Sequence, residues 1–348
     1  MSALKGVRVI DLTRILAGPF CSQLLADMGA EVIKIERRDG DPVRKQGAFQ
    51  NGFSWYFAQF NRNKKSIVLN LRSDAGKAAL TRLLESADVL LENYRPGVLA
   101  DMGFDNECLE AINPRLIIGN VNGFGSTGPY VDRPAFDFIA QAMSGFMSVN
   151  GDPDGEAMRA APPMSDLIAG LYAAFGVVSA LVARGGPGSD RGQTVETSLT
   201  NGLISLLAYL SAEYFATGEN PKRTGNNHPI VAPYGLFQAS DGSVAVAPSN
   251  DEFVHRFLGA IGLKELLDLD AFASNTRRMA NRDELNARIN EVMMTEPVDH
   301  WITVINRAGC PCGRVMQLSD VFSDPQVQAQ DMVLEVGHPD HGMTKMTG

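Results

Sequence analysis

The sequence predicts an α/β protein whose N-terminal part is an open parallel sheet with helices on both faces. Three observations support this prediction. Short strand-like runs alternate with helical patterns over residues 7–121, glycine and proline stand at the junctions between them, and two long apolar helical stretches follow. A chain of 348 residues is long enough for about two domains.

The first segment predicts a strand, a helix and a second strand. Residues 7–12 (VRVIDL) are a short run rich in β-branched side chains. Ala17-Gly18-Pro19 interrupts this run and favours a helix start, because proline is tolerated in the first helical turn. Residues 20–28 have helical spacing and end at Gly29, and residues 31–36 (EVIKIE) return as a strand. Such a unit implies a parallel sheet with a right-handed crossover.

The same alternation continues along the chain. Further strands are predicted at residues 65–71, 89–92, 116–121 and 193–198. Helices are predicted at residues 74–86, 109–112, 136–147 and 165–183, with a glycine-rich turn at 185–192.

The composition changes after residue 210. Residues 217–233 are polar and rich in turn-forming residues, as in a linker. Two short strands are expected at residues 234–238 and 244–247, and two amphipathic helices at 253–261 and 284–294. This part of the chain is predicted to be a small α+β domain.

Composition and charge exclude several classes of protein. The chain is 45% hydrophobic and 20% charged, as in a globular protein, and its formal net charge is −9, which gives no general reason to bind nucleic acid. We see no apolar run long enough to span a bilayer and no signal pattern at the N-terminus, so no membrane partner is expected. The four cysteines are too few and scattered for a disulfide scaffold, which predicts a cytoplasmic protein.

The end of the second predicted strand suggests a nucleotide ligand. Glu36 stands where a Rossmann protein binds a ribose hydroxyl, but residues 15–19 lack the glycine fingerprint that admits a pyrophosphate. Arg37 and Arg38 follow at once, and guanidinium groups there favour a ribose that carries a phosphate. NADP and coenzyme A both carry such a phosphate, and solvated surface charge is the alternative.

A second motif lies at the start of the helix predicted at 165–183. Pro162 and Pro163 impose an extended approach, which places Ser165 or Asp166 at the helix N-terminus. Asp166 is then either an ordinary cap or a carboxylate that the helix dipole keeps ionised for attack on a carbonyl.

Other catalytic motifs are missing from the sequence. Residues 123–128 (GFGSTG) do not form a G-x-S-x-G elbow, although their glycines could let a ligand approach the backbone. The five histidines are scattered and no metal-ligand spacing is present, so no metal is predicted.

A series of short motifs extends over nearly the whole chain, at residues 6–12, 17–19, 25–36, 61–66, 92–97, 113–117, 123–125, 128–129, 165–166, 192–193, 225–226, 228–229 and 311–313. In this order and at this spacing they resemble the class III CoA-transferases, a family that includes formyl-CoA transferase, carnitine CoA-transferase and α-methylacyl-CoA racemase.

This resemblance implies a discontinuous, two-domain architecture. It predicts a large Rossmann-like CoA-binding domain at 1–197, a linker at 198–224, a small α/β domain at 225–313, and a second linker at 314–348 that returns toward the large domain. Family members form an interlocked homodimer, and they usually continue for some tens of residues past the position of Gly348. The sequence leaves open whether Gly348 is the native C-terminus; without such a final segment, part of the large domain would be uncovered.

The resemblance also implies a reaction and a set of site residues. Asp166 matches the family's catalytic aspartate, which moves CoA between an acyl-CoA and a free carboxylic acid through anhydride and aspartyl-CoA thioester intermediates. Coenzyme A and acyl-CoA are then substrates, and no permanently bound cofactor is expected. The positions that match the CoA-binding segments are Leu16, Ala17, Arg37, Leu69, Arg72, Asn93, Tyr94, Arg95, Phe136 and Asp137.

Departures from the family pattern bear on the substrate. Leu16 stands where formyl-CoA transferase has a glutamine, and Pro134 replaces a lysine. These changes argue against formyl-CoA and oxalate, and the pattern is closer to branches that use small dicarboxylic acids. Arg14, Arg44 or Lys45 are candidates to bind a distal carboxylate.

Three other functions compete with this prediction. A racemase needs a base on each face of the substrate, but Phe136 occupies the position of its histidine and Asn250 aligns near its second acid. An NADP-dependent oxidoreductase conflicts with the missing glycine fingerprint. A non-catalytic acyl-CoA-binding protein would leave Asp166 in its motif without a role.

Overall fold

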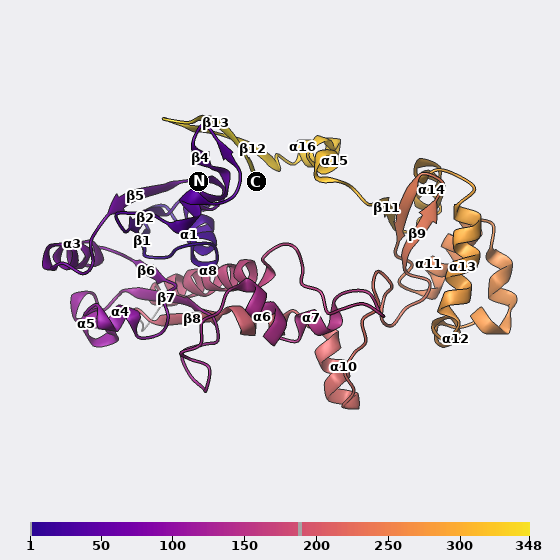
Figure 1. Cartoon of the computed structure of the whole chain (residues 1–348), viewed down its shortest axis with the longest axis horizontal. Coiled ribbons are helices and arrows are strands. Elements are labelled where there is room, and N and C mark those ends of the chain that lie inside the picture. The colour runs from indigo at the N-terminus through magenta and orange to yellow at the C-terminus, as the bar shows by residue number, and fades with distance from the viewer. Residues whose placement is uncertain (1, 187–189) are drawn as a thin grey trace. The chain divides into compact units, whose positions relative to one another are not determined.

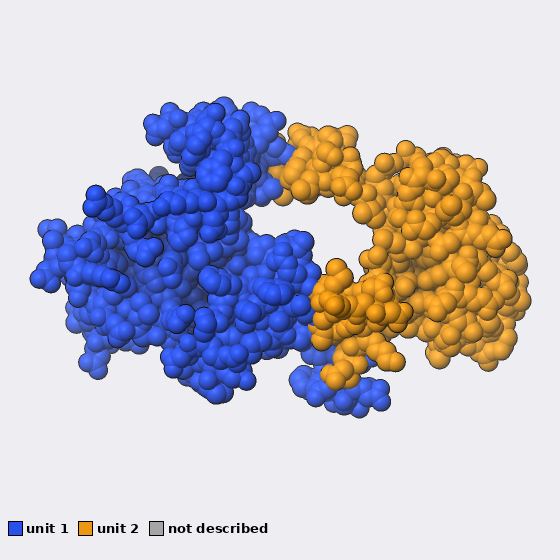
Figure 2. All heavy atoms as spheres, viewed as in Figure 1, with its two compact units in different colours: residues 1–147, 159–219, 333–348 blue, residues 148–158, 220–332 orange. Residues whose placement is uncertain are grey.

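The computed structural model describes residues 2–186 and 190–348, and it divides into two compact units (Figure 2). The first unit comprises residues 1–147, 159–219 and 333–348, and the second comprises 148–158 and 220–332. The short segment 148–158 belongs to the second unit and is hydrogen-bonded to it: the Gly225 N–H donates to the Gly151 carbonyl at 3.0 Å, and the Arg223 side chain donates to the Asp152 carbonyl at 3.1 Å.

A six-stranded parallel sheet is the centre of the first unit. Its spatial order is β5-β2-β1-β6-β7-β8, formed by Lys64–Val68, Glu31–Glu36, Arg8–Asp11, Val89–Glu92, Ile117–Asn122 and Thr194–Ser198. This is the doubly wound order. From β1 the chain adds β2 and β5 on one side of the sheet, and it then returns to the other side of β1 and adds β6, β7 and β8. The predicted α/β class and the predicted strands are confirmed.

Helices bury both faces of this sheet, because successive strand residues point to opposite sides (Figure 1). Val9, Leu91 and Ile117 belong to one apolar cluster, with α1 (Ala17–Asp27) and α8 (Met164–Arg184). Their neighbours Ile10, Leu90 and Ile118 belong to the other cluster, which also includes residues of α3 (Asp74–Leu84), α4 (Val98–Asp101) and α5 (Asn106–Ile112).

Helix α8 corrects one prediction from the sequence. Within the described residues it is long and apolar enough, by length and composition, to cross a membrane, whereas we expected no such run. Ala169, Ala173 and Val177 on this helix are buried in the core of the unit. The packing against α1 is close, because a Cβ at Gly170 would lie 2.5 Å from the Ala17 carbonyl oxygen. The helix thus serves as a core helix of this unit.

Three predicted segments differ in detail. The helix predicted at 136–147 is two helices, α6 (Asp137–Met143) and α7 (Phe146–Val149), because Gly145 between them has a φ of +84°. Residues 198–224, predicted as a linker, contain α9 (Leu199–Ser205) and α10 (Tyr209–Thr217). The turn predicted at 185–192 includes residues 187–189, which lie outside the described residues.

The second unit is built on a three-stranded antiparallel sheet in the order β11-β10-β9, with strands Cys312–Arg314, Gly242–Val246 and Gly235–Ala239. Its apolar core includes Phe237, Phe257 and Leu285, all fully buried. The unit's helices are α11 (Asp251–Ala260), η2 (Lys264–Asp268), η3 (Asp270–Phe272), α12 (Asn275–Ala280), α13 (Arg282–Met293), α14 (Val298–Arg307), α15 (Leu318–Ser323) and α16 (Pro325–Ala329).

Several elements of the first unit have no counterpart in the sequence prediction. Residues 333–348, predicted as linker, form a hairpin of β12 (Val333–His338) and β13 (Gly342–Thr347). This hairpin contacts α2 (Trp55–Asn61), where the Gln59 side chain donates to Thr347 at 2.6 Å. The remaining elements are η1 (Pro42–Lys45), β3 (Phe49–Gln50) and β4 (Phe53–Ser54).

Candidate active site

A cleft lies at the carboxyl ends of β1 and β6, the point from which the strand order runs outward in both directions. Ligands of doubly wound sheets bind at this point, because the loops after the two central strands separate there. The cleft has a volume of about 170 Å³. Its walls are the segments after β1, β6 and β7, the start of α8 and the segment before α6: Arg14–Ala17, Asn93–Pro96, Val121–Gly123, Gly125, Val131, Arg133–Phe136, Asp166 and Leu199.

Asp166 reaches this cleft from the first turn of α8. The N-cap of the helix is Pro163, so Asp166 is not a capping residue, which corrects the simpler of its two interpretations. In the part of the chain that the structure describes, no hydrogen bond or ion pair reaches its carboxylate. Burial and the nearby Asp137 carboxylate raise the pKa of Asp166 to about 7.

Asp137 fixes the start of the helix that carries Asp166. Its Oδ1 accepts from the Ser165 N–H at 2.9 Å and from the Ser165 hydroxyl at 2.8 Å. Gln141 donates to the other carboxylate oxygen at 2.8 Å and accepts from the Ala160 N–H at 2.8 Å. Asp137 therefore holds the segment on both sides of Pro163 and places a negative charge near Asp166.

The loops that follow β1 and β6 are hydrogen-bonded to each other. The Arg14 N–H donates to Asn93 Oδ1 at 2.9 Å, and Asn93 Nδ2 donates to the Arg14 carbonyl at 2.8 Å. The loop after β7 completes the cleft with Gly123 and Gly125, as the glycine-rich sequence suggested. Gly125 has a φ of +94°, a conformation that favours glycine.

Three arginines are among the residues that line the cleft: Arg14, Arg95 and Arg133. The Arg133 guanidinium lies over the Tyr130 ring, 4.5 Å from its centre. Arg44, the other arginine proposed for a distal carboxylate, lies elsewhere: it donates to Glu36 at 2.8 and 2.6 Å. Glu36 is therefore engaged by Arg44 and not free to bind a ribose, and neither Arg44 nor Lys45 lines the cleft.

Most of the site residues predicted from the sequence meet in this cleft. Its lining includes Leu16, Ala17, Asn93, Tyr94, Arg95, Phe136 and Asp166. Asp137 lies behind the lining, and Arg37 is close enough to Tyr94 to affect the pKa of that phenol. Leu69 packs against the core cluster and Arg72 is exposed at the turn before α3, so the cleft includes neither.

Sequence reasoning missed Tyr56, on the short helix α2. Burial raises the pKa of Tyr56 to about 12, and the carboxylates of Asp166 and Asp41 add to the effect. The tyrosine thus lies within electrostatic range of Asp166, although 110 positions separate the two residues in the sequence. Its sequence neighbours, Trp55 and Phe57, are apolar and gave no sign of a site.

The fold and the cleft together define a doubly wound α/β protein with an aspartate, Asp166, in the cleft at the centre of its sheet. Comparison with known proteins identifies the family to which it belongs. The profile of CoA-transferase family III matches residues 4–348, and the chain belongs to this family of CoA-transferring enzymes.

Curated relatives agree with this membership. The chain is 40% identical to the acetyl-CoA:oxalate CoA-transferase of Acetobacter aceti, over 95% of this chain and 85% of that protein. It is 36% identical to the succinate–glutarate CoA-transferase of Agrobacterium fabrum, over 96% and 85% of the two chains. A CAIB/BAIF family protein from Brucella suis, solved by crystallography, is 36% identical and superposes with a TM-score of 0.86 over 99% of this chain and 94% of that one.

The cleft does not fit the racemase alternative. Phe136, at the position expected for a histidine base, is exposed and lines the cleft, and a phenyl ring cannot exchange a proton. Asn250, near the second expected acid, is the N-cap of α11 and accepts from the Phe253 N–H at 2.9 Å. Neither position supplies a base.

Proposed function

We propose that this protein moves CoA from an acyl-CoA to a free dicarboxylic acid, with Asp166 as the nucleophile. The observation that supports this most directly is the state of Asp166. Asp166 lines the cleft, its carboxylate has no hydrogen-bond or ion-pair partner among the described residues, and its pKa is raised to about 7. A carboxylate that is poorly solvated and unpaired is a stronger base and nucleophile than one in water.

Each step of the proposed reaction conserves the acyl bond energy. The Asp166 carboxylate attacks the donor thioester and expels CoA thiolate, which leaves a mixed anhydride. The thiolate attacks the aspartyl carbonyl and releases the donor acid, which leaves an aspartyl-CoA thioester. The acceptor carboxylate attacks this thioester and expels the thiolate again, and the thiolate then takes the acceptor acyl group, which restores the free carboxylate. Water must be excluded while these intermediates exist.

The charges in the cleft support a dicarboxylate acceptor. One carboxylate must reach Asp166, and a second needs a cation at a distance set by the length of the acid. Arg14 and Arg133 are cationic residues on two different walls of the cleft, and a guanidinium group is suited to a carboxylate. The names of the two relatives include oxalate for one and succinate and glutarate for the other. Leu16 and Pro134 argue against oxalate, so we expect a longer dicarboxylate as the acceptor, and oxalate belongs in the panel as the direct comparison.

A panel of acyl-CoA donors and dicarboxylate acceptors, analysed by mass spectrometry, tests the proposal. We expect CoA exchange with at least one pair, and after hydroxylamine treatment a hydroxamate at Asp166. Asp166→Asn should abolish both, and Asp101→Asn, an exposed acid on α4, serves as the matched control. Exchange at the wild-type rate by Asp166→Asn would rule out the nucleophile.

We further propose a cytoplasmic homodimer of interlocked chains. All four cysteines are free, as expected for a protein in a reducing compartment. Large apolar side chains are exposed along α8, including Leu171, Phe175 and Val182, and such a surface is typical of a subunit interface.

A further inference from the structure

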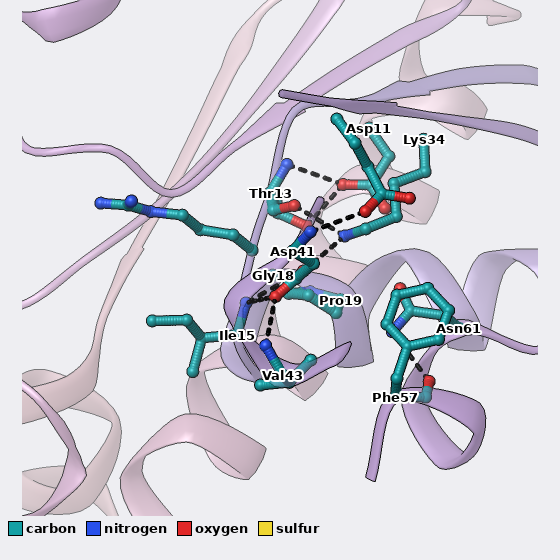
Figure 3. Close-up of polar contacts among 12 residues, drawn as sticks. Asp11, Thr13, Ile15, Gly18, Pro19, Lys34, Asp41, Val43, Phe57 and Asn61 are labelled. Carbon is teal, nitrogen blue, oxygen red and sulfur yellow. Dashed lines mark hydrogen bonds and ion pairs between the residues drawn. The ribbon is translucent and has the colours of Figure 1, made fainter. Parts of the chain in front are cut away.

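Behind the loop that follows β1 lies a group of buried charged side chains that the proposed reaction does not use (Figure 3). Lys34 on β2 and Asp41 before η1 form an ion pair at 2.9 Å, and each side chain is 1% exposed. Asp11 and Lys64 form a second buried pair at 3.3 Å. Buried ion pairs contribute little net stability compared with apolar residues of the same volume. These two pairs therefore invite a different explanation, namely that they fix the conformation of the neighbouring backbone.

Both pairs hold the backbone of the β1–α1 loop. Lys34 Nζ donates to the Thr13 carbonyl at 2.8 Å, and Asp11 accepts from the Thr13 N–H at 2.9 Å. The Asp41 carboxylate accepts from the Ile15 N–H at 3.2 and 3.3 Å, one distance for each oxygen. Asp41 is itself fixed, because its N–H donates to Glu36 at 2.7 Å and its Oδ1 accepts from the Val43 N–H at 3.1 Å.

The loop needs this support because of Ile15. Its φ is +71°, in the left-handed region, and a β-branched residue rarely adopts that conformation. The Asp41 carboxylate binds the N–H of this very residue. The conformation directs the chain into Leu16 and Ala17, which line the cleft together with Asp166.

We infer that Lys34 and Asp41 are positioning residues that hold Ile15 in its left-handed conformation and so fix the Arg14–Ala17 wall of the cleft that Asp166 also lines. This inference rests on the proposed function, since the wall matters only if substrate binds there. The two residues do not touch the cleft themselves, because neither belongs to its lining.

The test separates positioning from simple stabilisation. Asp41→Leu alone leaves a buried unpaired lysine, so the Tm falls and activity falls with it. Lys34→Met/Asp41→Leu removes both charges and should restore most of the Tm, but it leaves the Ile15 N–H without its acceptor. We expect kcat of this double variant to stay roughly 10- to 100-fold below wild type, with a smaller change in KM. The matched control is Arg184→Met/Asp88→Leu, which removes an ion pair of 2.6 Å at the amino ends of the strands, away from the cleft.

Ile15→Gly supplies a second, independent test. Glycine adopts a positive φ without strain, so the loop should need the ion pair less. We therefore compare the fold loss of kcat on removal of the Lys34–Asp41 pair in two backgrounds. The loss should be several-fold smaller in the Ile15→Gly background than in the wild-type background. Equal losses in the two backgrounds, or a double variant that recovers kcat together with Tm, would overturn the inference.

A third measurement decides the inference even if the proposed function fails. If the wild type transfers CoA between no donor and acceptor, the function is wrong, but the crystal structure of Lys34→Met/Asp41→Leu still reports the loop. A negative φ at Ile15, with Leu16 displaced, supports the positioning role. A φ that stays near +71° contradicts it.

Discussion

At the scale of single residues, the Asp166 carboxyl stands out because its neighbours disfavour its charge. Burial and Asp137 raise its pKa from 3.8 to about 7, so between these values the folded protein binds a proton that the unfolded chain does not. The ionised form therefore costs stability above pH 7, and the cost disappears below about pH 4.

Asp166→Asn removes this cost and should stabilise the protein only where the wild type is ionised. We expect the free energy of unfolding to rise by roughly 1–3 kcal/mol at pH 8 and to be unchanged at pH 4. Urea denaturation at the two pH values measures it. An equal gain at both would mean that charge is not the cause.

The raised pKa of Asp166 also determines how kcat/KM depends on pH. The free enzyme needs Asp166 ionised, so kcat/KM should fall about ten-fold per pH unit below pH 7 and level off above it. Asp137→Asn removes the neighbouring negative charge while keeping an oxygen for Ser165, so the limb should move to lower pH. If the acidic limb of the pH profile of kcat/KM does not shift in Asp137→Asn, the ionisation that causes it belongs to a group other than Asp166.

At the scale of elements, the site depends on contacts between loops that the sequence keeps far apart. Asn93 bonds both backbone groups of Arg14 across 79 positions, and it joins the two loops at the centre of the sheet. Asn93→Ala should lower stability by no more than about 1 kcal/mol, because the bonds are exposed.

The larger effect of Asn93→Ala should be on substrate binding. With its two walls unlinked, the cleft should bind CoA roughly ten-fold more weakly. Titration calorimetry with CoA measures this. Asn106→Ala on α5, outside the cleft, is the control and should bind CoA as the wild type does.

The elements also show how far the sequence alone could reach. The strands β1, β2, β6, β7 and β8 were predictable within a residue or so, because apolar runs between turn residues leave few alternatives. Pro162 and Pro163 placed Asp166 in the first helical turn. The helices within 198–224 and the hairpin of 333–348 were missed, because the resemblance assigned both stretches as linkers and their elements are only six to nine residues long.

The site was predictable only in part, for a physical reason. Asp166 and Asn93 were found through family motifs, whereas Tyr56 and Asp41 were missed. Each of these two acts through a contact with a distant segment: Asp41 bonds the Ile15 backbone, and Tyr56 lies within electrostatic range of Asp166. Such pairs follow from the winding order of the sheet, which local patterns do not encode.

At the scale of the whole molecule, helix α8 has two apolar sides but only one is covered. Ala169, Ala173 and Val177 are buried in the core, whereas Phe175 is 72% exposed and Leu171 and Val182 are exposed beside it. A single chain that left these side chains in water would forgo the free energy of burying them, so a second copy of the chain is the proposed cover.

Sedimentation velocity should give twice the chain mass of 37.5 kDa. Phe175→Asp should raise the dimer dissociation constant at least ten-fold, because a carboxylate would be buried there without a partner. Met294→Asp, an exposed methionine in the second unit, should leave association unchanged. A wild type that sediments as a monomer at every concentration would remove the dimer from the proposed function.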